Sequence, residues 1–119
     1  SLAEGWNMPL LEAMACGKHT IATNYSGHTA FCDNTTTLLI EPTGKTPAVD
    51  GMWFKEGSKT NCGNWITYDI DEMIEHMRSI YKLHQGGIIL NENAIQKSKE
   101  FTWENSARRI LEKCEDICL

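Results

Sequence analysis

The chain has 119 residues, 41% of them hydrophobic and 23% charged, which is the composition of one ordinary globular domain. This length excludes a two-domain enzyme within the chain. The 11 Lys and Arg residues against 16 Asp and Glu residues leave a formal net charge of -5, the wrong sign for gripping phosphate backbones. We therefore expect neither nucleic acid nor an anionic membrane as a partner.

Cysteine use and the first residues indicate where the protein resides. The five cysteines are odd in number and form no Cys-x-x-Cys pair, which argues against a disulfide framework and favours a reducing compartment. No apolar run approaches the roughly 18 residues that span a bilayer, and the start at Ser1 has neither a basic signal region nor an initiator Met. We therefore expect a soluble, cytoplasmic chain that was cut from a longer protein.

Residues 1–41 have the pattern of an α/β unit. Strong helix formers follow Met8, Pro9 stands where a first helical turn tolerates proline, and Gly17 ends the run. The β-rich runs that come after are short, as in buried strands. The expected elements in chain order are a helix at 8–16, a strand at 19–23, a turn at 24–27, one helical turn at 28–32 and a strand at 37–40.

Residues 42–64 break any regular pattern. Proline and glycine recur through the segment, which predicts a loop longer than compact domains usually carry. The aromatic residues in it or just after it are Trp53, Phe54 and Trp65. They either form a platform for a sugar or pin the loop to the body of the protein, and aromatics in a long loop more often pin it.

Residues 65–119 are mostly helical in pattern. The expected elements are an edge strand at 65–68, helices at 69–84 and 88–100, and a last helix that begins at a Thr102 cap. Apolar residues recur at three- and four-residue steps in the first and last of these helices, which gives each an apolar stripe. Cys114 and Cys118 share the stripe of the last helix, and we expect them to pack in a core or an interface.

The balance of elements predicts the fold class. Two or three short strands cannot form a sheet that buries three amphipathic helices. We therefore expect an α/β chain that holds a single partial domain over residues 1–119. Its parts are a fragment of a Rossmann-like parallel sheet in residues 1–41, the long loop, and a helical C-terminal cover, with further strands upstream.

The densest candidate site is Glu4-Gly-Trp-Asn-Met-Pro-Leu-Leu-Glu12, two carboxylates with seven residues between them. The amides from Gly5 to Met8 and those of the first helical turn have no intrahelical acceptor, and the helix dipole adds partial positive charge, so they suit a phosphate. Gly5 lets a ligand approach the backbone closely. Carboxylates on both sides of such a turn suit hydroxyl groups at both ends of a phosphate, which describes a nucleotide sugar.

Residues 1–27, which contain this site, resemble a known family. Ser1-Leu-Ala-Glu-Gly-Trp-Asn-Met-Pro-Leu-Leu-Glu-Ala-Met-Ala-Cys-Gly17, followed by Thr20-Ile-Ala-Thr-Asn-Tyr-Ser-Gly27, is similar to the donor-binding half of retaining glycosyltransferases with the GT-B fold, family 4 in particular. The family pattern is Glu-Gly-Phe-Gly-x-Pro-x-x-Glu-Ala-Met-Ala-x-Gly. Trp6 therefore stands where Phe is usual, and Asn7 stands where Gly is usual. Phe101-Thr-Trp103 also resembles the start of the closing helix in that family.

The resemblance implies a role for each residue of the motif. Glu4, the candidate catalytic residue, would meet hydroxyl groups of the transferred sugar, and Glu12 would accept hydrogen bonds from the ribose. The candidate substrate-binding positions, whose backbone would lie against the sugar and the diphosphate, are Gly5, Trp6, Asn7 and Met8. Such enzymes transfer a hexosyl group from a nucleotide diphosphate sugar to an acceptor hydroxyl with retention, without an obligatory bound metal, so we expect no cofactor and no metal ligand.

The same resemblance sets expectations for the chain as a whole. The acceptor, a sugar or another hydroxyl compound, would bind through an N-terminal domain that the chain lacks. We therefore expect no transferase activity from these 119 residues alone. A truncated sheet would leave an exposed edge, so a homo-oligomer through that edge is also expected.

Three alternatives stay open. In the first, the chain is a non-catalytic α/β binding or assembly module that keeps the nucleotide-sugar cradle as a scaffold. In the second, Glu4 and Glu12 are solvated charges that only satisfy the helix dipole. The third is a small zinc-binding domain whose ligands would be Cys16, His19, His28 and Cys32, although no known zinc finger has this order.

Overall fold

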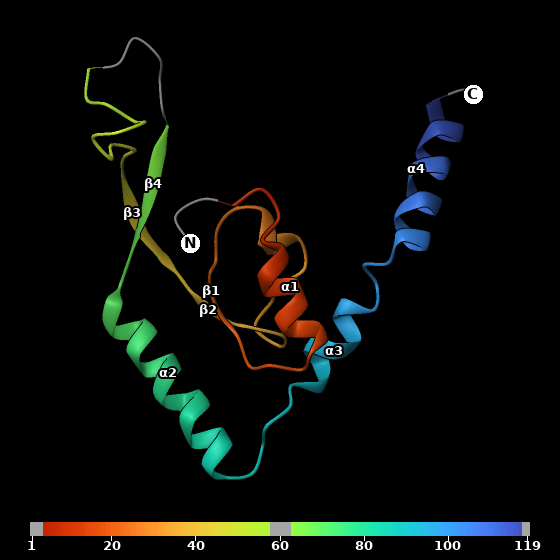
Figure 1. The fold of residues 1–119 in the computed structure, drawn as a ribbon, viewed down its shortest axis with the longest axis horizontal. Helices are drawn as coiled ribbons and strands as arrows, with labels where there is room; N and C mark the ends of the chain where they lie inside the picture. Colours follow the sequence, from red (N-terminus) through yellow and green to blue (C-terminus); the bar gives the residue numbers. More distant parts are fainter. Residues whose placement is uncertain (1–3, 58–62, 118–119) are drawn as a thin grey trace.

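Short strands and helices alternate at the start of the fold, and helices alone make up its C-terminal part. A computed structural model describes residues 4–57 and 63–117 of the chain. Within these residues lie four α-helices, a 3₁₀ helix (η1) and two two-stranded sheets (Figure 1). In chain order the elements are α1 (Met8–Ala15), β1 (Ile21–Thr23), η1 (Gly27–Ala30), β2 (Leu38–Ile40), β3 (Pro42–Pro47), β4 (Asn64–Tyr68), α2 (Ile70–Gln85), α3 (Glu92–Ser98) and α4 (Trp103–Ile117).

The first α/β unit forms where the sequence predicts it. α1 begins after an Asn7 cap and ends just before Gly17, whose φ of 68° is the left-handed conformation that glycine adopts without cost after a helix. β1 and β2 pair in parallel, with Ile21 opposite Leu38. Both strands are a little shorter than expected, and η1 supplies the predicted helical turn between them.

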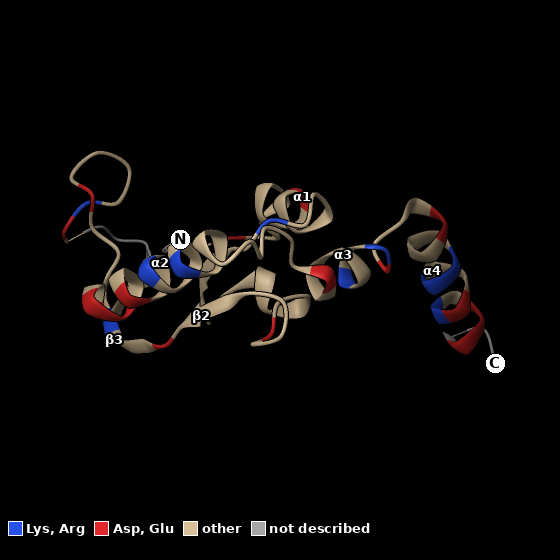
Figure 2. Ribbon diagram, turned by 90° about the horizontal axis from the view of Figure 1, so that it is seen from below, with Lys and Arg blue, Asp and Glu red and all other residues tan. Residues whose placement is uncertain are grey.

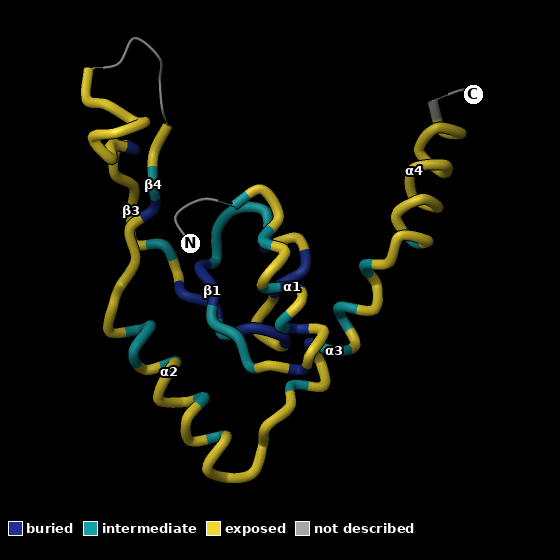
Figure 3. Tube along the Cα trace, in the orientation of Figure 1, coloured by how far each residue is buried: buried dark blue, intermediate teal, exposed yellow. Residues whose placement is uncertain are grey.

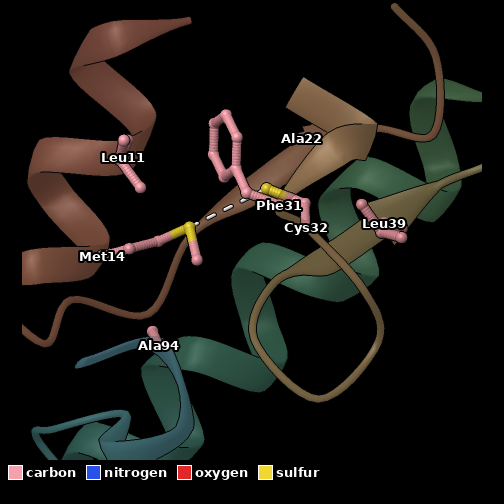
Figure 4. Packing of buried hydrophobic residues seen from close by; sticks show 7 residues of the cluster. All are labelled: Leu11, Met14, Ala22, Phe31, Cys32, Leu39 and Ala94. Atoms are coloured by element: carbon pink, nitrogen blue, oxygen red, sulfur yellow. Dashed lines mark hydrogen bonds between the residues drawn. The ribbon is translucent and has the colours of Figure 1, made fainter. Parts of the chain in front are cut away.

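The buried core lies between α1, the parallel strands and α3. Met14 and Ala94 are fully buried, and the Cys32 thiol donates to the Met14 sulfur across a distance of 3.8 Å (Figure 4). The other members of the buried cluster are Leu11, Ala22, Phe31 and Leu39. One face of α1 is therefore committed to packing, whereas Met8 and Glu12 on its other face are exposed.

A β-hairpin corrects the loop that the sequence predicts at 42–64. β3 pairs antiparallel with β4, with Pro42 opposite Tyr68 and Pro47 opposite Asn64 at the two ends of the ladder. The prolines stand at the ends of β3, where a missing N–H is tolerated, and the strand is exposed along almost its whole length. It therefore has no alternating apolar pattern from which it could be predicted. The expected edge strand is confirmed as β4.

The three expected C-terminal helices are present, but they do not form a common cover. α2 begins at an Asp69 cap and touches the parallel sheet, where the His76 ring lies 3.0 Å from the carbonyl oxygen of Leu39. α3 starts later than expected because the Asn91 side chain caps it, and it packs against α1. α4 extends away from the core, with Trp103 92% exposed (Figure 1). The predicted cover is therefore wrong for α4.

The described part of the chain is open rather than compact. Its radius of gyration is 17.9 Å, against about 13.5 Å for a compact domain of this length. The β3–β4 hairpin and α4 project from the α/β core on different sides, and the buried residues concentrate between them (Figure 3). Charged residues gather on α2 and α4 (Figure 2). Among the residues described, none of the helices combines the length and apolar character that a bilayer span requires.

These elements make a mixed α/β fold with one parallel and one antiparallel pair of strands. Within residues 4–57 and 63–117, β1 pairs with β2 alone, so no strand covers its other edge there. An edge of this kind is the feature through which we expect a homo-oligomer, and that expectation stays a prediction.

Candidate functional site

Asn7 shapes the start of α1. Its backbone has φ 69° and ψ 61°, the left-handed region that Gly and Asn tolerate best. Its side-chain oxygen accepts from the Leu10 amide at 3.4 Å, and its carbonyl oxygen accepts from the amides of Leu10 and Leu11 at 3.2 and 3.3 Å. Asn in place of the Gly of the family pattern therefore suits the backbone conformation that this position requires.

The backbone amides around the Asn7 cap are suited to bind an anion. Four of these amides donate no hydrogen bond to an acceptor within residues 4–57 and 63–117. We refer to them as the free amides, and they belong to Gly5, Trp6, Asn7 and Met8. Apart from Gly5 and its two chain neighbours, no described residue has an atom within 4 Å of the position that a Cβ on Gly5 would take, which leaves room for a ligand. Because the free amides lie at the positive end of the α1 dipole, an anionic group is the ligand that fits them.

The two predicted carboxylates flank the free amides. Glu4 comes directly before them and is half-buried. Glu12 lies one turn after Met8 on the exposed face of α1, about 6 Å further along the helix axis. Its carboxylate makes no hydrogen bond or ion pair with any described residue. Residues 4–17 contain no Lys or Arg, so this segment offers an anion only backbone groups.

A turn from another part of the chain holds Glu4 and Gly5. The Ser26 hydroxyl accepts from the Glu4 amide at 2.9 Å and donates to the Glu4 carbonyl oxygen. The Gly27 amide donates to the same oxygen at 3.1 Å. Because this turn follows β1, the motif lies at the carboxyl end of that strand. The sequence predicts the turn but not this contact, which joins residues 22 positions apart.

An apolar groove adjoins the start of α1. The Trp6 ring packs against those of Phe31 and Phe101, with centroids 5.2 and 5.6 Å away. A cavity of about 280 Å³ lies beside these rings, and Met8 and Trp103 also line it. The segment that resembles the start of the family's closing helix therefore lies next to the motif. Apolar walls beside a few polar groups are typical of ligand sites.

A cavity of about 390 Å³ lies at the other end of the parallel strands, away from the motif. Polar side chains line it, but several already hold the fold together. The hydroxyls of Thr20 and Thr37 are 3.1 Å apart, and the side-chain Nδ2 of Asn91 donates to the Thr36 carbonyl oxygen at 2.9 Å. We therefore do not include this cavity in the candidate site.

The residues of the zinc alternative do not converge. Cys16 is exposed after the end of α1. His28 is buried, with its Nε2 atom 2.6 Å from the carbonyl oxygen of Thr23, and Cys32 is buried against Met14. Among the described residues, no three His, Cys, Asp or Glu side chains are grouped so that they could hold a metal ion. The zinc alternative therefore has no ligand set in this structure.

The loop aromatics do not form a common platform. The rings of Phe54 and Trp65 meet edge to face, with centroids 6.3 Å apart. Trp53 is 82% exposed. The contact between Phe54 and Trp65 therefore pins the loop to its own hairpin rather than to the α/β core.

A scan against protein-family models, a search of curated proteins and a search of solved structures each found no match for this chain. The likeness of residues 1–27 to family 4 glycosyltransferases therefore stays a resemblance. Function has to be inferred from the motif and its geometry.

Proposed function

We propose that this chain carries part of the donor site of a retaining glycosyltransferase with the GT-B fold, similar to family 4. The ligand is a nucleotide diphosphate sugar. The whole enzyme transfers the hexosyl group from the diphosphate to an acceptor hydroxyl with retention at the anomeric carbon. In this proposal the α/β core is part of a Rossmann-like domain, and the acceptor binds to a domain outside the chain.

The observation that carries the proposal is the row of free amides between Glu4 and Glu12. Amides at a helix start suit a diphosphate, which carries its charge on oxygens that accept hydrogen bonds. A carboxylate on each side suits the hydroxyl groups that a nucleotide sugar has at both ends of the diphosphate. Glu4 then orients the transferred sugar, and Glu12 accepts from the ribose.

The place of the motif in the fold supports the same proposal. Open α/β sheets bind their ligands outside the carboxyl ends of the strands, and the contact with the Ser26-Gly27 turn puts the motif at that end of β1. The apolar groove beside Trp6 and Met8 adds surface against which parts of the ligand can pack.

Catalysis in this proposal depends on placement and charge. The free amides stabilise the departing diphosphate, because hydrogen bonds from N–H groups strengthen as negative charge develops on its oxygens. Glu4 holds the sugar in the orientation for transfer. Since residues 4–17 supply no cationic side chain, cations that face the diphosphate come from other parts of the whole enzyme.

The test is calorimetric titration of the chain with UDP-glucose, UDP-N-acetylglucosamine and GDP-mannose. Glu4→Gln and Glu12→Gln keep the size of each side chain and remove its charge. We expect at least one sugar nucleotide to bind, and each variant to weaken it about tenfold or more, because charged acceptors make the stronger hydrogen bonds. Glu112→Gln, an exposed change on α4, is the matched control and should leave binding unchanged.

Two results would contradict the proposal. One is the absence of binding by all three nucleotide sugars up to millimolar concentration. The other is binding to Glu4→Gln and Glu12→Gln that equals binding to the wild-type chain.

A further inference from the structure

We infer that the Ser26-Gly27 turn is the positioning device of the donor site: it holds Glu4 and Gly5 in the conformation that presents the Glu4 side chain and the free amides to the ligand. The identity of the ligand rests on the proposed function, whereas the contacts do not. Ser26 and Gly27 are positioning residues, because they act on the ligand through Glu4 and Gly5.

Hydrogen bonds from this turn fix the backbone of Glu4 on both sides. The Ser26 hydroxyl accepts a hydrogen bond from the Glu4 amide and donates one to the Glu4 carbonyl oxygen. The Gly27 amide donates to that same carbonyl oxygen. The segment with the free amides is therefore anchored at the residue where it begins.

Ser26 makes these contacts in a backbone conformation that glycine would adopt more easily. Its φ of 78° and ψ of −167° lie in a region that residues with a side chain rarely occupy. Thr29 holds it there, because its hydroxyl and its amide donate to the Ser26 carbonyl oxygen at 2.7 and 3.2 Å. The two hydrogen bonds that the Ser26 hydroxyl makes with Glu4 therefore offset the strain of this backbone conformation.

Position 27 requires glycine because the backbone of Gly5 lies directly against it. A Cβ at this position would lie 1.9 Å from the carbonyl oxygen of Gly5 and 2.5 Å from its carbonyl carbon. Both are backbone atoms, so no side chain can rotate to make room. Any larger residue at position 27 would push Gly5, and the free amides after it, away from the turn.

The turn is itself tied to the sheet. The buried His28 ring comes within 2.6 Å of the Thr23 carbonyl oxygen, at the end of β1. The Tyr25 amide donates to the same oxygen at 2.7 Å. The end of β1 thus sets the position of the turn, and the turn sets the position of the motif.

The experiment compares Ser26→Gly and Ser26→Ala in the 119-residue chain. Both remove the hydroxyl, but only glycine relieves the backbone strain, so Ser26→Gly should unfold in urea at or above the wild-type midpoint while Ser26→Ala unfolds below it. We expect both variants to bind the nucleotide sugars named above at least about tenfold more weakly. Without ligand, hydrogen exchange of the Glu4 and Gly27 amides should be at least about tenfold faster.

Ser79→Ala is the matched control, because the Ser79 hydroxyl donates only to the Glu75 carbonyl oxygen within α2. It should change neither nucleotide-sugar binding nor exchange at Glu4. Loss of binding in Ser26→Gly without loss of stability separates positioning from a merely structural role.

The outcomes distinguish this inference from the proposed function. If the wild-type chain binds a nucleotide sugar and Ser26→Gly binds it equally well, the inference is overturned and the function stands. If the wild-type chain binds none of them, the proposed function is contradicted, and hydrogen exchange alone tests the inference about the turn. Unchanged exchange at Glu4 and Gly27 in Ser26→Gly then overturns the inference, and faster exchange supports the anchoring of Glu4.

Discussion

At the scale of single residues, the first helix divides its side chains between the core and the candidate site. Leu11 and Met14 are buried on one face of α1. Met8 and Glu12, four positions apart and so on one face, are exposed. The same short helix can therefore hold the fold with one face and present its free N-terminal end to a ligand.

The core side of this division makes a prediction for the cysteines. Burial raises the pKa of the Cys32 thiol, against the opposing effect of the hydrogen bond from Thr37. Less of it is thiolate at neutral pH, and the thiolate is the form that reacts. We expect iodoacetamide to modify the exposed Cys16 and Cys114 at least about tenfold faster than Cys32, as measured by mass spectrometry of the native chain.

Denaturant supplies the control for this experiment. Unfolding the chain in urea should bring the alkylation rates of Cys16, Cys32 and Cys114 close together. Modification of Cys32 as fast as that of Cys16 in the native chain would show that the Cys32 environment is not the buried one described above.

At the scale of elements, one carboxylate organises the tip of the β3–β4 hairpin. Asp50 accepts from the amides of Met52, Trp53 and Phe54, each at 2.8 Å. These bonds, that from Phe54 first, hold the pKa of the Asp50 carboxyl below its ordinary value of 3.8. The exposed Trp53 therefore sits on a structured turn.

The lowered pKa gives the tip a pH dependence with a definite sign. A carboxyl whose pKa is lower in the folded state stabilises that state above its unfolded pKa, and this stabilisation is lost as the pH falls through the folded value. We expect amide exchange at Trp53 and Phe54, measured by NMR, to show the turn intact at neutral pH and opening only below about pH 4. Asp50→Ala should open the turn at neutral pH as well.

Glu56→Gln is the control for the tip, since Glu56 is an exposed carboxylate of the same loop that holds none of these amides. It should leave exchange at Trp53 and Phe54 unchanged. Unaltered exchange in Asp50→Ala would contradict the role given to Asp50.

Elements with local signals could be predicted from the sequence. α1 has its cap, its proline and its closing glycine within eleven residues, from Asn7 to Gly17, and α2 has a capping Asp69 and a regular apolar stripe. β3 could not be predicted, because its pairing partner is distant in sequence and both of its faces are exposed. The departure of α4 from the core could not be predicted either, because an apolar stripe indicates that a face can be buried but not against what.

The candidate site was predictable to the same extent. Glu4, Glu12 and the free amides follow from spacing along one segment, because a helix start presents its amides wherever it occurs. Ser26 was not predictable as part of the site, since its hydrogen bonds to Glu4 depend on how the chain returns after β1.

At the scale of the whole molecule, the open shape separates three parts. The motif lies on the α/β core, while the hairpin tip and α4 extend away from it (Figure 1). Both arms expose large apolar side chains, of which Trp53 and Trp103 are the most exposed. A ligand could therefore bind to these exposed apolar side chains instead of to the motif. A test of function has to show where the ligand binds as well as whether it binds.

The measurement that does so is chemical-shift mapping of the ¹⁵N-labelled chain titrated with UDP-glucose, UDP-N-acetylglucosamine and GDP-mannose. We predict that the largest amide shift changes occur at the free amides, with smaller changes at Ser26 and Gly27 and none at Trp53. Shift changes confined to the hairpin tip or to α4, or no change with any of the three at millimolar concentration, would contradict the claim that the segment from Glu4 to Glu12 binds a nucleotide diphosphate sugar.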